Sequence, residues 1–129
     1  MRFHRLSIFA ASVAVACASA SNTGIPLRNA ELITKEEIAG AHVSNAYDAI
    51  SALRPGFLRY RGKTTISGSD TGFPRVYLNS QLYGDLASLR NLEVGNIRSI
   101  RYYNASDAST HFGLGNASGA IEIITDAEP

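Results

Sequence analysis

The sequence has little of several features that mark specialised small proteins. Among its 129 residues it contains one cysteine, Cys17, and no tryptophan. A single cysteine excludes an internal disulfide, so a folded domain must be held by an apolar core. The formal net charge is only +1, and the basic residues are spread along the chain, which argues against a nucleic-acid binder. No apolar run approaches the roughly twenty residues that a membrane-spanning helix needs.

The sequence also lacks the usual patterns of catalytic and metal-binding sites. His42 and His111 stand apart from each other, without the spacing of metal ligands. No serine occupies a nucleophile elbow, and the eleven acidic residues are dispersed. Gly113 and Gly115 resemble part of a phosphate-binding loop, but the helix that such a loop requires does not follow them. We therefore expect a protein that is not an enzyme, with no catalytic residue, cofactor or metal site.

The first twenty residues are typical of a secretory signal peptide. Arg2 and Arg5 provide a positive start, Leu6 to Val15 is a short apolar stretch, and Ala18-Ser19-Ala20 supplies small residues for cleavage. Loss of the two arginines would leave ten basic residues of the original twelve against eleven acidic ones. We expect an exported protein, with a tether at residues 21–30 and one folded domain at residues 31–126.

Cys17 has two interpretations. The stretch from Val13 to Cys17 resembles a bacterial lipobox, in which Cys17 would become the lipidated N-terminus, although Ala14 stands where leucine is usual. Alternatively, cleavage falls after Ala20 and Cys17 is discarded. We expect membrane association only through this lipidation.

The pattern of apolar and capping residues predicts short helices. Thr34 and Glu37 have the spacing of a capping box, which predicts a helical turn near Lys35. Ser44 is expected to cap a second helix that Pro55-Gly56 terminates. The second helix is expected over Asn45–Leu53. A short helix is expected from Asp85 to Leu89. A last helical turn, which Ser106 and Asp107 cap, is expected to run to Phe112 and end at Gly113.

Alternating apolar and polar residues predict the strands, which lie at Phe57–Arg61, Arg75–Leu78, Gln81–Tyr83, Ile97–Tyr103 and Ala120–Thr125. The second and third of these form a hairpin with its turn at Asn79-Ser80. In the last strand Glu122 points away from Ile121 and Ile123, so we expect that face to be at least partly solvated. The expected fold class is α+β, with a small mixed sheet and two or three short helices.

The chain carries a recognisable series of motifs. The stretch from Phe112 to Thr125 contains an aromatic–glycine pair, small residues, a glycine and then the strand Ala-Ile-Glu-Ile-Ile-Thr. Upstream, Val76–Ser80 is a strand that ends in two turn residues, Ile97–Tyr102 is a strand, and Asn45–Phe57 is a helix followed by Pro-Gly. In this order the motifs resemble the plug domain of TonB-dependent outer-membrane receptors, over about residues 31–126.

The sequence departs from the family pattern at several positions. Arg98 and Arg101 stand where acidic residues are usual, Ser118 replaces a second glycine, and Asn79-Ser80 replaces Asp-Gly. A transporter barrel of about 22 strands, at about ten residues each, needs roughly 200 residues or more. The sequence that follows Thr125 does not supply them, so we expect a stand-alone plug-like module rather than a transporter.

The resemblance implies a non-enzymatic exported binding module of the bacterial envelope. We expect it in the periplasm or on the periplasmic face of the outer membrane, as an accessory to or relative of TonB-dependent transport. The expected partner is an outer-membrane barrel, an energising envelope protein or a small ligand, and no nucleic acid. The alternative is a small structural or ligand-binding envelope lipoprotein that uses the same fold.

Binding residues concentrate on loops, which directs attention to the Gly62–Pro74 loop and the Gly113–Gly119 segment. For each glycine, a role in backbone geometry alone is the favoured interpretation. The candidate contact residues are Arg61, Lys63, Asp70, Gly113, Gly115, Asn116 and Gly119.

Overall fold

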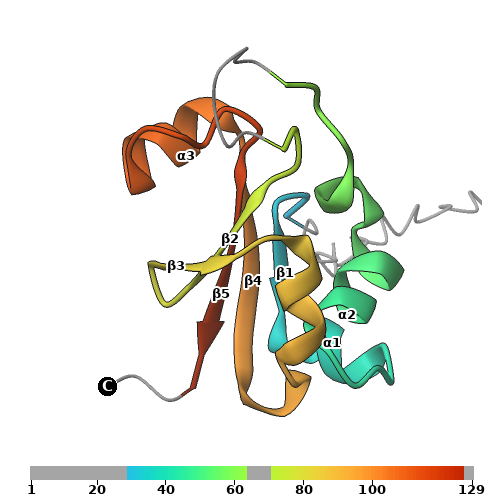
Figure 1. The fold of residues 1–129 in the computed structure, drawn as a ribbon. Coiled ribbons are helices and arrows are strands. Elements are labelled where there is room, and N and C mark those ends of the chain that lie inside the picture. The colour runs from blue at the N-terminus through green and yellow to red at the C-terminus, as the bar shows by residue number, and fades with distance from the viewer. Residues whose placement is uncertain (1–28, 64–70, 127–129) are drawn as a thin grey trace, which may run out of the picture.

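Short strands and short helices alternate along the chain. The computed structural model describes residues 29–63 and 71–126, so the predicted signal peptide, Cys17 and Asp70 lie outside the described residues. The elements, shown in Figure 1, are β1 (Leu32–Thr34), α1 (Lys35–Gly40), α2 (Ala46–Leu53), the 3-10 helix η1 (Pro55–Leu58), β2 (Arg75–Leu78), β3 (Gln81–Gly84), the 3-10 helices η2 (Leu86–Asn91) and η3 (Val94–Asn96), β4 (Ile97–Tyr103), α3 (Ala105–Phe112) and β5 (Ala120–Thr125).

The strands form one five-stranded mixed sheet in the order β1-β4-β5-β2-β3. β5 runs parallel to β2 and antiparallel to β4, and the remaining neighbours pair antiparallel. The expected α+β class with a small mixed sheet is therefore confirmed. No helix among the described residues has the length and apolarity needed to cross a membrane.

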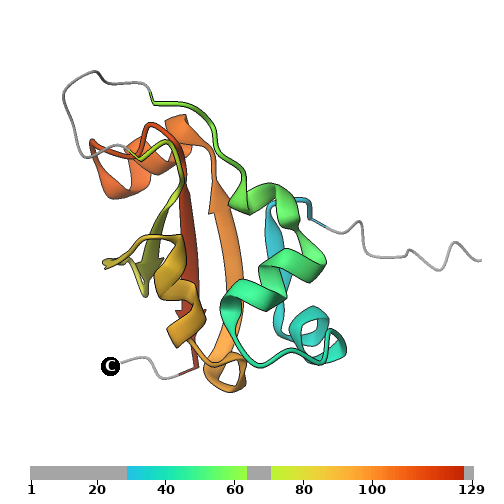
Figure 2. The ribbon, with the colours of Figure 1, turned by 45° about the vertical axis from the view of Figure 1, so that its right-hand side comes forward.

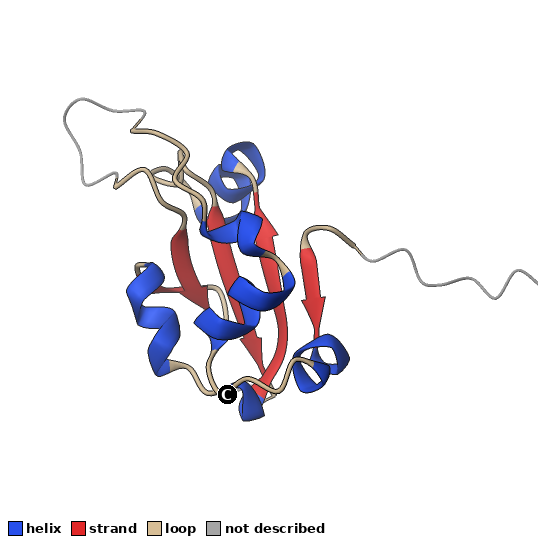
Figure 3. Ribbon diagram, turned by 90° about the vertical axis from the view of Figure 1, so that its right-hand side faces the viewer, coloured by secondary structure: helices blue, strands red, loops and turns tan. Residues whose placement is uncertain are grey.

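The main core lies between one face of the sheet and the helices α1, α2, η1 and η2, which Figures 2 and 3 show side by side on that face. Every strand except β3 contributes to it. The buried aliphatic side chains of this core include Ile33, Ile38, Ile50, Val76, Leu89, Ile97, Ile100, Ile121 and Ile123. Phe57 and Tyr102 join them, with ring centroids 5.2 Å apart.

A smaller cluster lies on the opposite face of the sheet, beneath α3. Tyr77, Ala108 and Ala120 are buried there, and Phe112 packs against them. The rings of Tyr77 and Phe112 stack with their centroids 3.9 Å apart. Because α3 is a single short helix, it covers only part of this face of the sheet (Figure 1).

The predicted start of the first helix is confirmed. The Glu37 amide donates to the Thr34 hydroxyl and the Thr34 amide donates to the Glu37 carboxylate, which together form a capping box. Glu37 also accepts from the guanidinium of Arg54 at 3.1 Å. This contact joins the start of α1 to the end of α2.

The predicted cap of the second helix is wrong by one residue. The helix begins at Ala46, and the Asn45 side chain rather than Ser44 accepts from the Asp48 amide, at 2.9 Å. Asn45 also donates to the Asp48 carboxylate. Ser44 is engaged differently, because its carbonyl accepts from the Val94 amide.

The predicted cap of the last helix is also wrong. Asn104, not Ser106 or Asp107, is the cap, and its side chain accepts from the Asp107 amide at 3.0 Å. The helix therefore begins earlier than expected, although it ends at Phe112 and Gly113 as predicted. Asparagine caps as well as serine or aspartate does, so adjacent candidates are hard to separate by type alone.

The predicted strand at Phe57–Arg61 is absent from the structure. Pro55 opens a 3-10 turn, in which the Phe57 amide donates to the Arg54 carbonyl and the Arg59 amide donates to the Gly56 carbonyl. Phe57 is buried in the main core. The alternating pattern of Phe57–Arg61 therefore reflects a helical turn that buries the Phe57 ring, and not a strand.

The other predicted strands are confirmed, as is the hairpin between β2 and β3. Asn79 and Ser80 have φ angles of +48° and +67°, the left-handed pair of a two-residue hairpin turn. Asp85 caps η2 by accepting from the Ser88 amide, as expected for a helical segment at this point.

Candidate functional site

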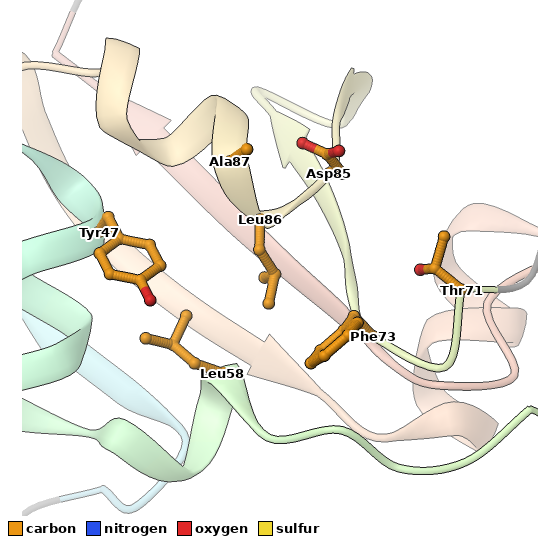
Figure 4. A pocket seen from close by; sticks show the side chains of 7 residues that line it. All are labelled: Tyr47, Leu58, Thr71, Phe73, Asp85, Leu86 and Ala87. Atoms are coloured by element: carbon orange, nitrogen blue, oxygen red, sulfur yellow. The ribbon is translucent and has the colours of Figure 1, made fainter.

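An open cavity of about 450 Å³ lies where α2, η1, η2 and the segment before β2 meet. Such a volume falls within the range of ligand sites in proteins. We call this cavity the groove, and its lining residues are Tyr47, Leu58, Thr71, Phe73, Asp85, Leu86 and Ala87 (Figure 4).

The walls of the groove are mostly apolar, with the Tyr47 hydroxyl among them. Figure 4 shows the side chains of Tyr47, Leu58 and Phe73 directed toward a common space, with Leu86 above them. The Asp85 carboxylate and the Thr71 hydroxyl provide polar atoms. An apolar body with a polar or positively charged end is the kind of occupant that this combination suits.

Local contacts hold the aromatic walls. The Arg90 guanidinium lies 4.0 Å from the centre of the Tyr47 ring, a cation–π contact that fixes this side chain. On the other wall, Phe73 meets Tyr60 edge to face with ring centroids 5.2 Å apart. Phe73 and Tyr60 remain 39 % and 57 % exposed, so part of this aromatic surface faces solvent.

A second cavity, of about 150 Å³, adjoins the groove at its Asp85 end. It shares Thr71 and Asp85 with the groove, and Pro74, Arg75, Leu82 and Gly84 complete its lining. The two cavities together extend the concave surface from α2 to β3, the last strand of the sheet.

The two predicted contact loops meet at one end of the sheet. The Ser118 hydroxyl donates to the Gly62 carbonyl at 3.4 Å, and the Arg61 amide donates to the Gly72 carbonyl at 2.7 Å. Arg61 also stacks its guanidinium over the Tyr102 ring at 4.6 Å. Lys63 is exposed beside them. The structure therefore brings these loops together but places them outside the lining of the groove, apart from Thr71 and Phe73.

The Gly113–Gly119 segment has a structural role at several of its positions. Gly113, Gly115 and Gly119 have φ angles of +87°, +97° and +87°, which the other residues adopt with strain. Asn116 is only 1 % exposed, because the Tyr77 hydroxyl donates to its side chain and its amide donates to the Gly113 carbonyl. These contacts leave Asn116 no surface for a partner.

A buried carboxylate lies on the face of the sheet that carries α3. Glu122 alternates with Ile121 and Ile123 as expected, but it is not solvated: it is 3 % exposed. The hydroxyls of Ser80 and Tyr103 each donate to it at 2.8 Å. Burial raises the pKa of Tyr103, and the hydrogen bond to Glu122 and its charge raise it further.

Hydrogen bonds join the side chains of Ser80 and Tyr103 to that of Glu122. A serine hydroxyl beside a carboxylate resembles the start of a nucleophilic site. However, neither the groove nor the smaller cavity is lined by Ser80, Tyr103 or Glu122. We therefore interpret this trio as a structural link from the hairpin turn to β4 and β5.

The two histidines among the described residues are exposed and lie in different segments of the chain. His42 sits at φ +53° between α1 and α2, and His111 lies in the last turn of α3 with its ring stacked on Tyr103. No group of three or more metal-ligating side chains occurs among the described residues.

Only one part of the groove could be predicted from the sequence. Phe73 lies in a loop that was expected to bind, but Tyr47, Leu58 and Leu86 come from helical segments separated by many residues. Their apolar character predicted only a core, because nothing in a sequence shows that packing stops short and leaves a cavity.

A scan against protein-family models found no match to the chain, and a comparison with curated proteins found none either.

Proposed function

We propose that this protein is a non-enzymatic, exported binding module of the bacterial envelope, similar to the plug domain of TonB-dependent receptors. It acts as an accessory to outer-membrane transport and binds its partner in the groove. The observation that carries the binding role is the groove itself: an open apolar cavity of about 450 Å³ rimmed by Asp85 and Thr71. An exposed apolar surface of this kind is typical of an interaction site.

The plug-like part of the proposal has support from the positions of the motifs. Val76–Leu78 forms a strand that ends in a two-residue turn, and Ile97–Tyr102 lies within β4. The three glycines of the closing motif have left-handed backbone angles just before β5. These three elements support the plug-like part of the proposal, whereas the strand expected at Phe57–Arg61 is absent.

Site-specific photo-cross-linking in cells tests the proposal. Ala87 lines the groove and is exposed, whereas Ala39 is exposed on α1 outside the groove lining, so a photoreactive residue fits at both positions without disturbing the core. We expect Ala87 to cross-link to an outer-membrane barrel or an energising envelope protein, and Ala39 not to do so. Equal labelling from both positions, or none, would overturn the proposal.

A small ligand-binding lipoprotein is the second candidate, and the size of the groove favours it over a spacer without a ligand. Incorporation of a labelled fatty acid that Cys17→Ser abolishes, together with no cross-link from Ala87, would favour this alternative.

A further inference from the structure

β3 is a short edge strand that carries neither charge nor proline. Within the described part of the chain it pairs with β2 alone, and it is the last strand of the sheet. Its four residues include no charged side chain, and Leu82 and Tyr83 are 58 % and 42 % exposed. Edge strands are normally blunted by charge, proline or a cover, because their unpaired backbone groups accept further strands.

The irregularity in the hairpin leaves the first half of this edge in register. The register shifts between Val76 and Tyr77, near the Gly84 end, while Gln81 and Leu82 pair directly with Leu78 and Tyr77. Figure 1 shows β3 projecting from the sheet on the side away from β1. β3 is thus a short, uncharged edge that is in register at Gln81 and Leu82 and irregular at Tyr83.

The concave surface begins where this edge ends. Leu82 and Gly84 line the smaller cavity, which shares Asp85 with the groove. A chain that pairs with β3 and continues past Gly84 would reach the smaller cavity first and the groove next. The edge supplies backbone hydrogen bonds and the cavities supply pockets for side chains, the two parts of recognition by strand addition.

Charge at this surface selects the occupant. Asp85 is exposed and lines both cavities. Arg75 lines the smaller cavity, whereas no basic side chain lines the groove, so the Asp85 carboxylate is the charged group that faces the groove. A partner that carries a basic residue at this point would complement the carboxylate, whereas a second acidic residue would be repelled. β3 itself adds no charge, so an apolar stretch fits beside it.

We propose that an extended peptide segment of the partner adds to β3 as a further strand. It inserts an apolar side chain into the groove and sets a basic residue against Asp85. This inference rests on the proposed function, because it names the chemistry of the partner that the groove binds.

Selection from a phage-displayed library of random dodecapeptides, with the purified protein as bait, provides the probe. We expect enriched peptides to alternate apolar residues and to carry a lysine or arginine. Enrichment of no sequence, or of acidic sequences, would overturn the proposal.

An N-methyl scan of the best synthetic peptide tests for strand addition directly. Methylation of alternate amides should abolish binding and methylation of the intervening amides should leave it unchanged, because only every second amide of an added strand faces β3. Binding that shows no such alternation would overturn strand addition. The Ala87 cross-link would then still report on the proposed function separately.

Two variants test the named contacts. Asp85→Asn keeps a residue that caps η2 well, so the fold should be retained. It should weaken binding about fivefold at low salt, in line with an exposed ion pair. Leu114→Lys, at a side chain that is 95 % exposed and lines neither cavity, should leave binding unchanged. An unaltered affinity for Asp85→Asn would contradict the predicted basic contact.

A second copy of the chain is the competing occupant of β3. Sedimentation of the purified protein distinguishes it: we expect a monomer in the absence of peptide. A dimer that Leu82→Lys dissociates would show that β3 pairs with itself and would overturn the proposal.

Discussion

One face of the sheet is covered by α1, α2, η1 and η2 and buries mostly isoleucine and other aliphatic side chains, whereas the other face carries α3, stacked aromatic rings and a buried carboxylate. The first face is stabilised mainly by apolar area removed from water. The second depends more on specific hydrogen bonds, such as those of Glu122 and Asn116. Stability and uniqueness of the fold therefore have different sources on the two faces.

The largest effect is expected from a cavity on the aliphatic face. Ile100 is fully buried in the main core, so Ile100→Ala removes packed methyl groups and should lower the free energy of unfolding by about 2–5 kcal/mol. Ile124→Ala, at a half-buried side chain on β5, is the matched control and should lower the free energy of unfolding clearly less. Urea denaturation of both variants measures the difference, and equal losses would contradict the assignment of the core to one face.

The next effect concerns Gly119, at the junction between the closing motif and β5. A Cβ there would lie 2.5 Å from the Tyr102 hydroxyl and 2.7 Å from the Tyr103 carbonyl, at a φ of +87°. Gly119→Ala should therefore cost about 3 kcal/mol, from strain and overpacking together.

Gly113 provides the control for this variant, since it has the same φ of +87° but no atom within 4 Å of an added Cβ. Gly113→Ala should cost only the conformational part, about 1 kcal/mol. Thermal denaturation of the two variants separates crowding from backbone strain. Similar melting temperatures would show that the contacts around Gly119 yield easily.

The difference between the faces also explains which features the sequence predicts. The aliphatic strands β4 and β5 alternate clearly, because each sends one row of side chains into a continuous core. The Asn79-Ser80 turn was predicted for a similar reason, since a two-residue polar step between apolar runs is a local signal. These features depend on neighbouring residues in the chain.

Features that depend on distant residues were missed. The burial of Glu122 comes from Ser80 and Tyr103, which lie 42 and 19 positions away and reach it only after the sheet has formed. A charged residue in an alternating strand is usually solvated, so the sequence favoured the opposite result. The groove is missed in the same way, because helical segments from separate parts of the chain form its walls.

Removal of the buried carboxylate tests the polar face. Glu122→Ala leaves the hydroxyls of Ser80 and Tyr103 without their acceptor and should lower the free energy of unfolding by about 2 kcal/mol. Glu122→Gln keeps an acceptor and the shape of the side chain, so it should retain most of the stability. Chemical denaturation of the pair decides, and a Gln variant as unstable as the Ala variant would show that charge rather than hydrogen bonding matters here.

The smallest effect is a dependence on alkaline pH that belongs to the polar face. Burial, then the hydrogen bond to Glu122 and its charge, raise the pKa of Tyr103 in the folded protein. The folded state therefore holds this proton more tightly than the unfolded state, whose tyrosine titrates near pH 10. The contribution to stability is complete below that pH and is lost as the pH rises through the folded pKa.

Urea denaturation at a series of pH values between about 8 and 11 measures this loss. The free energy of unfolding should decline less steeply with pH for Tyr103→Phe than for the unmodified protein, because phenylalanine has no proton to lose. Tyr83→Phe, at an exposed ring on β3, is the control and should leave the decline unchanged, because the tyrosine hydroxyl that donates to Glu122 is that of Tyr103.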